Sequence, residues 1–94
     1  MSEQDHVRLR AFFSGSVQGV GFRFTTIHIA QGHDVAGFVK NLGDGRVELT
    51  AEGTKEELEN FLTAVQERMR RHIHSTESSW LPAGGEFTRF QIQY

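Results

Sequence analysis

The chain of 94 residues has no cysteine, so it can form no disulfide, no thiolate metal site and no cysteine nucleophile. It also lacks any run of roughly 20 apolar residues, which a membrane-spanning helix requires, and residues 1–6 are too polar for a secretory signal. We therefore predict a cytoplasmic protein with no membrane partner. Its length predicts a single domain over residues 1–94, with residues 1–6 as a flexible N-terminal tail.

An excess of positive charge is absent as well. Ten Lys and Arg residues stand against twelve Asp and Glu residues, which gives a formal net charge of −2. Proteins that bind nucleic acid by its phosphates usually show a basic surface patch or stripe. We therefore expect no nucleic-acid partner, and we expect any bound anion to be held by local geometry.

Apolar residues that alternate with other residues predict the strands of the fold. The pattern covers residues 7–13 and 47–52, and residues 35–40 are apolar and β-branched enough for a further strand. Asp44 and Gly45 supply turn chemistry for a hairpin between the second and third strands. In the third strand only the apolar set should meet the core, because Glu48, Thr50 and Glu52 would point to the other face of the sheet.

Two helices are predicted between these strands. Helical spacing of apolar residues favours a first helix over residues 22–31, with Gly32 just past its end. Thr54 and Glu57 have the spacing of a capping box that starts a second helix. That helix carries an apolar stripe made of Leu58, Phe61, Leu62, Val65 and Met69.

The remaining residues predict an edge strand over residues 73–80 and a short strand over residues 90–94. The resulting order is β-α-β-β-α-β plus a short C-terminal strand. This order predicts an α+β fold, a ferredoxin-like split β-α-β sandwich with one antiparallel sheet and two helices on the same face.

The segment from Gly15 to Arg23 reads G-S-V-Q-G-V-G-F-R and links the first strand to the first helix. Glycine lacks a Cβ, so successive backbone N–H groups can turn toward one anion, and the helix N-terminus adds unpaired donors. Arg23 would lie in the first helical turn, where its guanidinium could contact the same anion. Two alternatives remain open on spacing alone: the loop as a plain tight turn, and Arg23 as a surface residue that pairs with a carboxylate.

Other polar residues give weaker indications. Asn41 ends the second strand, where it could either form the hairpin turn or be brought by the sheet to the glycine loop. Five histidines are present, but no carboxylate or third histidine converges with His72 and His74, so we predict no metal site. Ser14 and Ser16 have no base at a local spacing that would make either a nucleophile.

The glycine-loop motif of Gly15–Arg23, followed by G-F-V-K-N at residues 37–41 and D-G-R-V at residues 44–47, resembles the acylphosphatase family. The resemblance continues through A-E-G at residues 51–53 and F-x-I-x-Y at residues 90–94, so it covers nearly the whole chain. The sequence departs from the family's usual pattern in a polar fourth strand over residues 75–78 and at Asp34.

The resemblance implies a hydrolase of small acyl phosphates that releases a carboxylate and inorganic phosphate without metal or organic cofactor. By the motif match, Arg23 is the phosphate-binding arginine and Asn41 is the residue that orients the attacking water. The backbone of the loop would hold the phosphoryl oxygens, through Ser16, Val17, Gln18, Gly19, Val20 and Gly21.

Two other functions are possible for such a fold. It also serves as an RNA-binding or small-ligand module, but Phe12 is the one aromatic candidate for base stacking on the central strands, and the third strand offers acidic residues instead. Acylphosphatase-like domains also occur within carbamoyl-phosphate-processing enzymes. The initiator methionine and the ending on a strand favour a free-standing protein, for which we predict a monomer.

Overall fold

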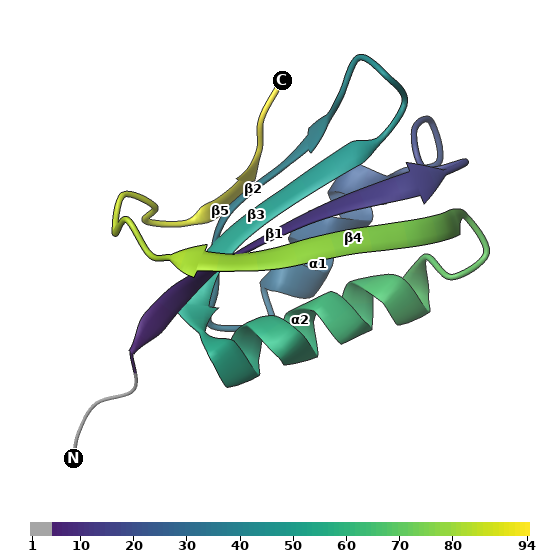
Figure 1. Ribbon diagram of the computed structural model, residues 1–94. Coiled ribbons are helices and arrows are strands. Elements are labelled where there is room, and N and C mark those ends of the chain that lie inside the picture. Colours follow the sequence, from purple (N-terminus) through teal and green to yellow (C-terminus); the bar gives the residue numbers. More distant parts are fainter. Residues whose placement is uncertain (1–4) are drawn as a thin grey trace.

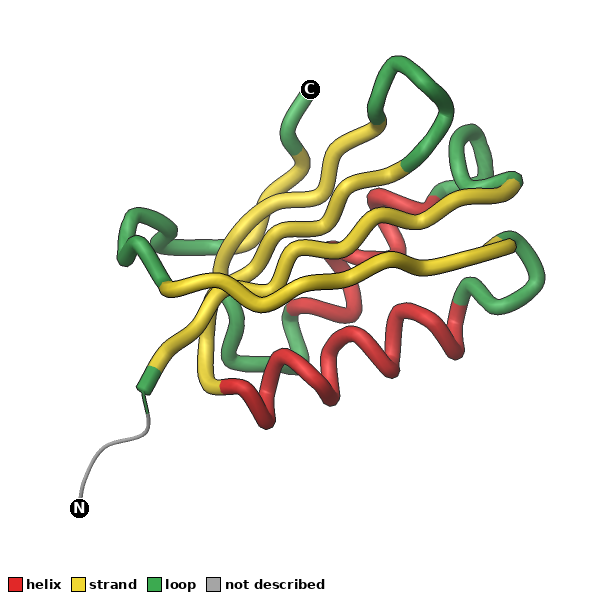
Figure 2. The backbone as a smooth tube through the Cα atoms, viewed as in Figure 1, coloured by secondary structure: helices red, strands yellow, loops and turns green. Residues whose placement is uncertain are grey.

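The computed structural model describes residues 5–94, which form one sheet with two helices packed on the same face (Figures 1 and 2). The elements follow one another as β1 (His6–Gly15), α1 (Phe22–Ala30), β2 (Ala36–Asn41), β3 (Val47–Thr54), α2 (Lys55–Arg68), β4 (Ile73–Pro82) and β5 (Phe90–Ile92). The sheet order is β4-β1-β3-β2-β5. The predicted ferredoxin-like α+β fold is confirmed. Neither helix of the described residues is long and apolar enough to cross a bilayer.

Strand β1 lies between β4 and β3 and supplies the centre of the core. Its alternate residues Leu9, Ala11 and Phe13 are fully buried, as the alternation predicted. The strand begins at His6, which pairs with Thr54, so it starts within the predicted tail of residues 1–6. Residues 1–4 of that tail lie outside the described residues.

The prediction of a wholly antiparallel sheet is wrong for the last strand. Strand β5 runs parallel to β2, with Gly37 opposite Phe90 and Val39 opposite Ile92. The reason is the sheet order: β4 and β5 occupy opposite edges, so residues 83–89 must cross from one edge to the other. The chain then enters the far edge in the same direction as β2 (Figure 1).

Both helices form from the predicted residues, with small differences at their ends. Helix α1 begins at Phe22 but ends at Ala30, one residue before the predicted end. At the start of α2 the Thr54 hydroxyl accepts a hydrogen bond from the Glu57 backbone N–H at 3.2 Å. The capping box is only half formed, because the Glu57 carboxylate accepts from the Asp34 N–H at 3.1 Å instead. Glu57 thus ties the connection between α1 and β2 to α2.

The outer face of β3 is buried, contrary to the prediction that only one sheet face would be covered. Glu48, Thr50 and Glu52 are all buried although they point away from the helices. The cause is the crossing segment and the long side chains of β1. Gly84 N–H reaches the Glu52 carboxylate at 2.8 Å, and the Arg8 Nε donates to the same carboxylate at 2.7 Å.

The Glu52 carboxylate should make the stability of the fold depend on pH. Burial alone would raise its pKa, but hydrogen bonds from Gly84, Arg8 and Gly85 outweigh that effect and hold the pKa below its ordinary value of 4.5. Because the pKa of Glu52 is lower in the folded state than in the unfolded state, its full contribution to the free energy of unfolding is present above the unfolded pKa. That contribution is lost as the pH falls through the lower folded pKa.

We expect Glu52→Gln to lower the free energy of unfolding at pH 7 by about 2–3 kcal/mol, because Arg8 loses its buried partner. The difference from wild type should shrink as the pH falls below about 4.5. Urea denaturation of wild type and Glu52→Gln at pH 7 and at successively lower pH measures the loss of stability and its dependence on pH. Glu86→Gln removes the exposed second partner of Arg8 and is the control with little expected effect. A difference that stays constant with pH would contradict the assignment.

Candidate functional site

The loop between β1 and α1 and the hairpin between β2 and β3 lie at the same end of the sheet (Figure 1). Between them is a cavity of about 100 Å³. It is lined by Val17, Gly19, Gly21, Phe22, Arg23, Phe24 and Asn41. The structure therefore brings the predicted arginine and asparagine to one cavity, together with three of the six loop residues that the sequence singled out.

The loop backbone leaves donors free at this cavity. Gly19 and Gly21 have φ values of 80° and 79°, a left-handed conformation that side chains with a Cβ rarely adopt. Gly21 is the N-cap of α1 and has no side chain to cap the helix, so the first-turn N–H groups keep no capping partner. Within residues 5–94, no backbone N–H of residues 16–21 donates a hydrogen bond to a backbone carbonyl. Such an arrangement is suited to an anion.

Gln18 joins the loop to the hairpin. Its side-chain Nε2 donates to the carbonyl oxygens of Leu42 at 2.8 Å and Arg46 at 2.9 Å. These two carbonyls belong to the hairpin that follows Asn41, so the side chain of Gln18 links the two halves of the site. The motif identified Gln18 by its backbone, and this role of the side chain was missed because it depends on a contact distant in sequence.

Arg23 carries an unneutralised charge beside the cavity. Among the described residues no carboxylate lies within 4.0 Å of its guanidinium, whereas Arg8, Arg10 and Arg46 all form ion pairs. The alternative of a surface arginine paired with a carboxylate is therefore not seen in this part of the chain. The guanidinium instead lies over the ring of Tyr94, with 5.2 Å between its Cζ and the ring centroid. An aromatic ring orients the cation without cancelling its charge.

Asn41 offers a buried acceptor that nothing in residues 5–94 satisfies. Its Oδ1 is the single buried side-chain polar atom of the described chain without a hydrogen-bond partner. Leaving such an oxygen unpaired costs about 1–3 kcal/mol. If Asn41 were needed for the turn, its Oδ1 would accept a hydrogen bond from a nearby backbone N–H. The unpaired Oδ1 thus favours the alternative that Asn41 serves the cavity over the alternative of a turn residue.

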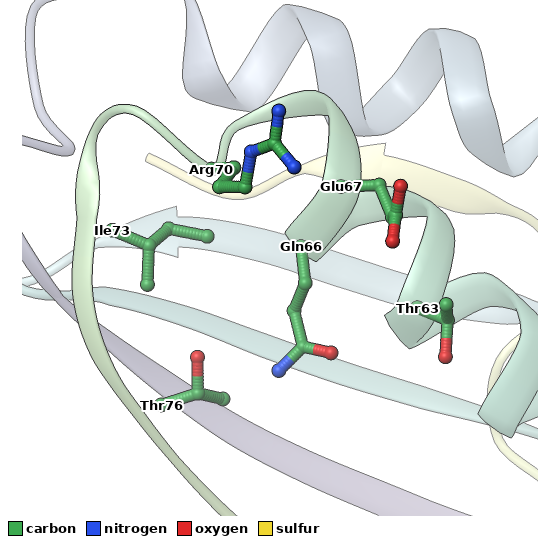
Figure 3. Close-up of a pocket in the computed structure, with 6 residues that line it drawn as sticks. All are labelled: Thr63, Gln66, Glu67, Arg70, Ile73 and Thr76. Carbon is green, nitrogen blue, oxygen red and sulfur yellow. The ribbon is translucent and has the colours of Figure 1, made fainter.

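A second hollow of about 280 Å³ lies between α2 and β4, and Figure 3 shows its lining. Gln66 extends its amide from the helix toward the strand, and the other lining residues are Thr63, Glu67, Arg70, Ile73 and Thr76. It is larger than the loop cavity, but no unpaired buried polar side-chain atom of the described chain lies there. Within residues 5–94, no group of three or more acidic or histidine side chains could hold a metal ion. The chemistry of an anion site is concentrated at the loop.

Comparisons of sequence and of structure both find acylphosphatases. The acylphosphatase family model matches residues 9–92 of this chain. An acylphosphatase of Listeria welshimeri is 53% identical over 53 residues, which is 56% of this chain and 57% of that protein. One of Nocardia farcinica is 38% identical over 97% of this chain and 98% of its own length. The crystal structure of acylphosphatase from Bacillus subtilis is 33% identical and has a TM-score of 0.83, covering 94% of this chain and 99% of that one.

Proposed function

The chain belongs to the acylphosphatase family, and on that basis we propose that it is an acylphosphatase that hydrolyses the carboxyl-phosphate bond of small acyl phosphates. The products are a carboxylate and inorganic phosphate. The leaving carboxylate is already a good leaving group, so the protein needs mainly to position the reactants and stabilise charge. In this mechanism no step uses a metal ion or an organic cofactor.

Arg23 and the loop amides bind the phosphoryl group. The free N–H groups at the start of α1 and those of residues 16–21 donate to the phosphoryl oxygens, and the guanidinium adds planar, charged donors. These donors are held in place before the substrate arrives, since the loop is bound to the hairpin through Gln18. Preorganised donors of this kind stabilise the transition state most, because they need no rearrangement as the charge moves.

Asn41 orients the attacking water. Its side-chain amide makes a hydrogen bond to that water, and the water oxygen attacks phosphorus opposite the leaving carboxylate. An amide cannot take a proton at neutral pH, so a phosphoryl oxygen of the substrate takes it. An acyl phosphate dianion and water then give a carboxylate and a dihydrogen phosphate monoanion, and both atoms and charge balance.

The observation that supports this mechanism most is that one cavity is lined by two side chains with unpaired polar groups, one a charged donor and the other an acceptor. Arg23 offers a charge with no carboxylate nearby among the described residues, and Asn41 offers a buried oxygen without a donor. The buried Asn41 oxygen is costly to leave without a donor, and the half-buried Arg23 guanidinium is free to pair with an anion. A phosphoryl group and a water molecule would supply what the two side chains lack.

The direct test is phosphate release from acetyl phosphate and benzoyl phosphate by the purified chain in the presence of a chelator. Acyl phosphates also decay spontaneously, so the rate is compared with that of a blank without protein. We expect the protein to release phosphate well above this blank. Activity that disappears with the chelator and returns with a divalent metal would contradict the metal-free mechanism. A folded chain that releases no phosphate would favour a binding module on the same fold. The monomeric state and the cytoplasmic location stay predictions from the sequence.

A further inference from the structure

Gln18 ties the loop of residues 16–21 to the hairpin of residues 42–46. Its Nε2 donates to the carbonyl oxygens of Leu42 and Arg46, at 2.8 Å and 2.9 Å. A carboxamide nitrogen carries two N–H groups, so both donors are used and the orientation of the amide is fixed. Within residues 5–94, no other side-chain hydrogen bond, and no backbone hydrogen bond of the turns and loops, joins this loop to this hairpin.

The two acceptors of Gln18 are the residues at which the hairpin closes. The Leu42 N–H donates to the Arg46 carbonyl at 2.8 Å, and the Gly45 N–H donates to the Leu42 carbonyl at 3.2 Å. Gln18 thus binds the hairpin where its backbone is already hydrogen-bonded. Leu42 follows Asn41 directly in the chain, so a shift of the loop relative to this end of the hairpin is also a shift relative to Asn41.

Packing restrains the ends of the loop but not its middle. Val17 and Phe22 are buried and anchor the two ends in the core. Between them, at Gly19 and Gly21, no atom of the described residues beyond the chain neighbours lies within 4 Å of the position that a Cβ would take. The hydrogen bonds of Gln18 are therefore the restraint that acts on the loop between its two anchors.

The groups of the proposed mechanism lie on two separate pieces of the chain. The loop N–H groups and Arg23 belong to one continuous segment, residues 16–23, whereas Asn41 lies at the end of β2. If the segment moves as a unit, its phosphate donors keep their mutual positions but move relative to Asn41. An in-line attack needs the water oxygen about 3–3.5 Å from phosphorus, and a displacement of about 1 Å can lower the rate about 10²-fold.

From these observations we propose that Gln18 is a positioning residue, whose side-chain amide holds the loop segment at the distance from Asn41 at which the water attacks phosphorus. This inference rests on the proposed acylphosphatase function. The side-chain donors of Gln18 are used on the hairpin and contact neither the phosphoryl group nor the water. The side chain therefore affects the reaction step through Asn41, and it affects phosphate binding only weakly.

The first test replaces Gln18 by methionine, which has a similar length and no hydrogen-bond donor. We expect Gln18→Met to lower kcat for benzoyl phosphate about 10- to 100-fold, while KM and the inhibition constant of inorganic phosphate change less than about threefold. Gln66→Met makes the same change in the hollow between α2 and β4 (Figure 3) and is the matched control with no expected effect. An unchanged kcat in Gln18→Met, or a loss of phosphate affinity as large as the loss of kcat, would overturn the proposal.

A double-mutant cycle shows whether Gln18 acts through Asn41. In the Asn41→Ala background we expect Gln18→Met to lower kcat less than about threefold, because the side chain that orients the water is already absent. A residue that only stabilised the loop would lower kcat by the same factor in both backgrounds. Equal factors would therefore contradict the proposed role, even if the single variant is impaired.

Gln18→Glu gives a readout within one folded protein. The ionised carboxylate has no donor for the two hairpin carbonyls, whereas the protonated form has one O–H donor and can restore one of the two hydrogen bonds. The facing carbonyl oxygens also disfavour the charged form, which raises the pKa of the introduced carboxyl. Relative to wild type at the same pH, kcat of Gln18→Glu should rise at least about threefold as the pH falls from about 7.5 to about 5. Gln18→Met should show no such rise, and a constant ratio for Gln18→Glu would count against the proposal.

The outcomes distinguish this inference from the function on which it rests. If wild type hydrolyses benzoyl phosphate and the Gln18 variants have the same kcat, Gln18 is not a positioning residue and the acylphosphatase function stands. If folded wild type hydrolyses no acyl phosphate, the proposed function fails and the role of Gln18 fails with it. Circular dichroism and urea denaturation of each variant verify that kcat is compared between folded proteins.

Discussion

Arg23→Ala is expected to lower kcat/KM for benzoyl phosphate by about 10²- to 10³-fold, the effect of losing one preorganised charged donor worth about 3–4 kcal/mol. KM should rise and kcat should fall, because the guanidinium contacts the phosphoryl group in the bound substrate and in the transition state. Inhibition by inorganic phosphate should weaken in parallel. Steady-state kinetics with benzoyl phosphate and a phosphate inhibition series measure all three.

Two variants serve as controls for Arg23. Arg23→Lys keeps the charge but loses the planar pair of donors, so it should recover only part of the activity. Arg70→Ala removes an arginine beside the hollow between α2 and β4, where we propose no chemistry, and should leave the kinetics unchanged. Full activity in Arg23→Ala would leave the loop amides as the sole phosphate site and contradict the role proposed here.

Asn41→Ala is expected to behave differently, with kcat reduced about 10²-fold or more and KM changed little. The side chain is proposed to contact the attacking water and not the phosphoryl group, so its loss affects the reaction step more than substrate binding. Inhibition by inorganic phosphate should therefore remain as in wild type. Single-turnover kinetics at saturating benzoyl phosphate would isolate the slowed step.

Stability gives an independent readout for Asn41. Its Oδ1 is buried and unpaired, so removing it relieves a cost of about 1–3 kcal/mol, which offsets the packing that the rest of the side chain provides. We expect the free energy of unfolding, measured by urea denaturation, not to fall. An asparagine required for the turn would instead destabilise the protein when replaced. A loss of about 2 kcal/mol or more, with kcat unchanged, would identify Asn41 as a structural residue.

The elements that follow local patterns were predictable from the sequence. The alternation in residues 7–13 correctly predicted which face of β1 is buried, because side chains of a strand point alternately to its two faces. The start of α1 at Phe22 followed from the helical spacing of its apolar residues, and the apolar stripe of α2 predicted its buried face. The polar residues of β4 suit its place as an exposed edge strand that pairs with β1 alone.

The burial of Glu48 and Glu52 was not predictable in the same way. Period-2 alternation states which residues share a face, but not what covers that face. Here residues 83–89 cross from β4 to β5, and Gly84 and Gly85 donate to the Glu52 carboxylate. Arg8, on the neighbouring strand β1, also donates to this carboxylate and helps to bury it. Nothing in the local sequence of β3 contains that information.

At the site the sequence determined the chemical groups: a glycine loop that leaves backbone donors free, an arginine in the first turn of α1 and an asparagine at the end of β2. Only the tertiary structure decided that Arg23 and Asn41 line one cavity, that Gln18 spans from the loop to the hairpin, and that Tyr94 lies over Arg23. The physical reason is that conformational preferences act between neighbours in the chain. Distances between β1, β2 and the C-terminus are set by sheet pairing and by packing of the shared core.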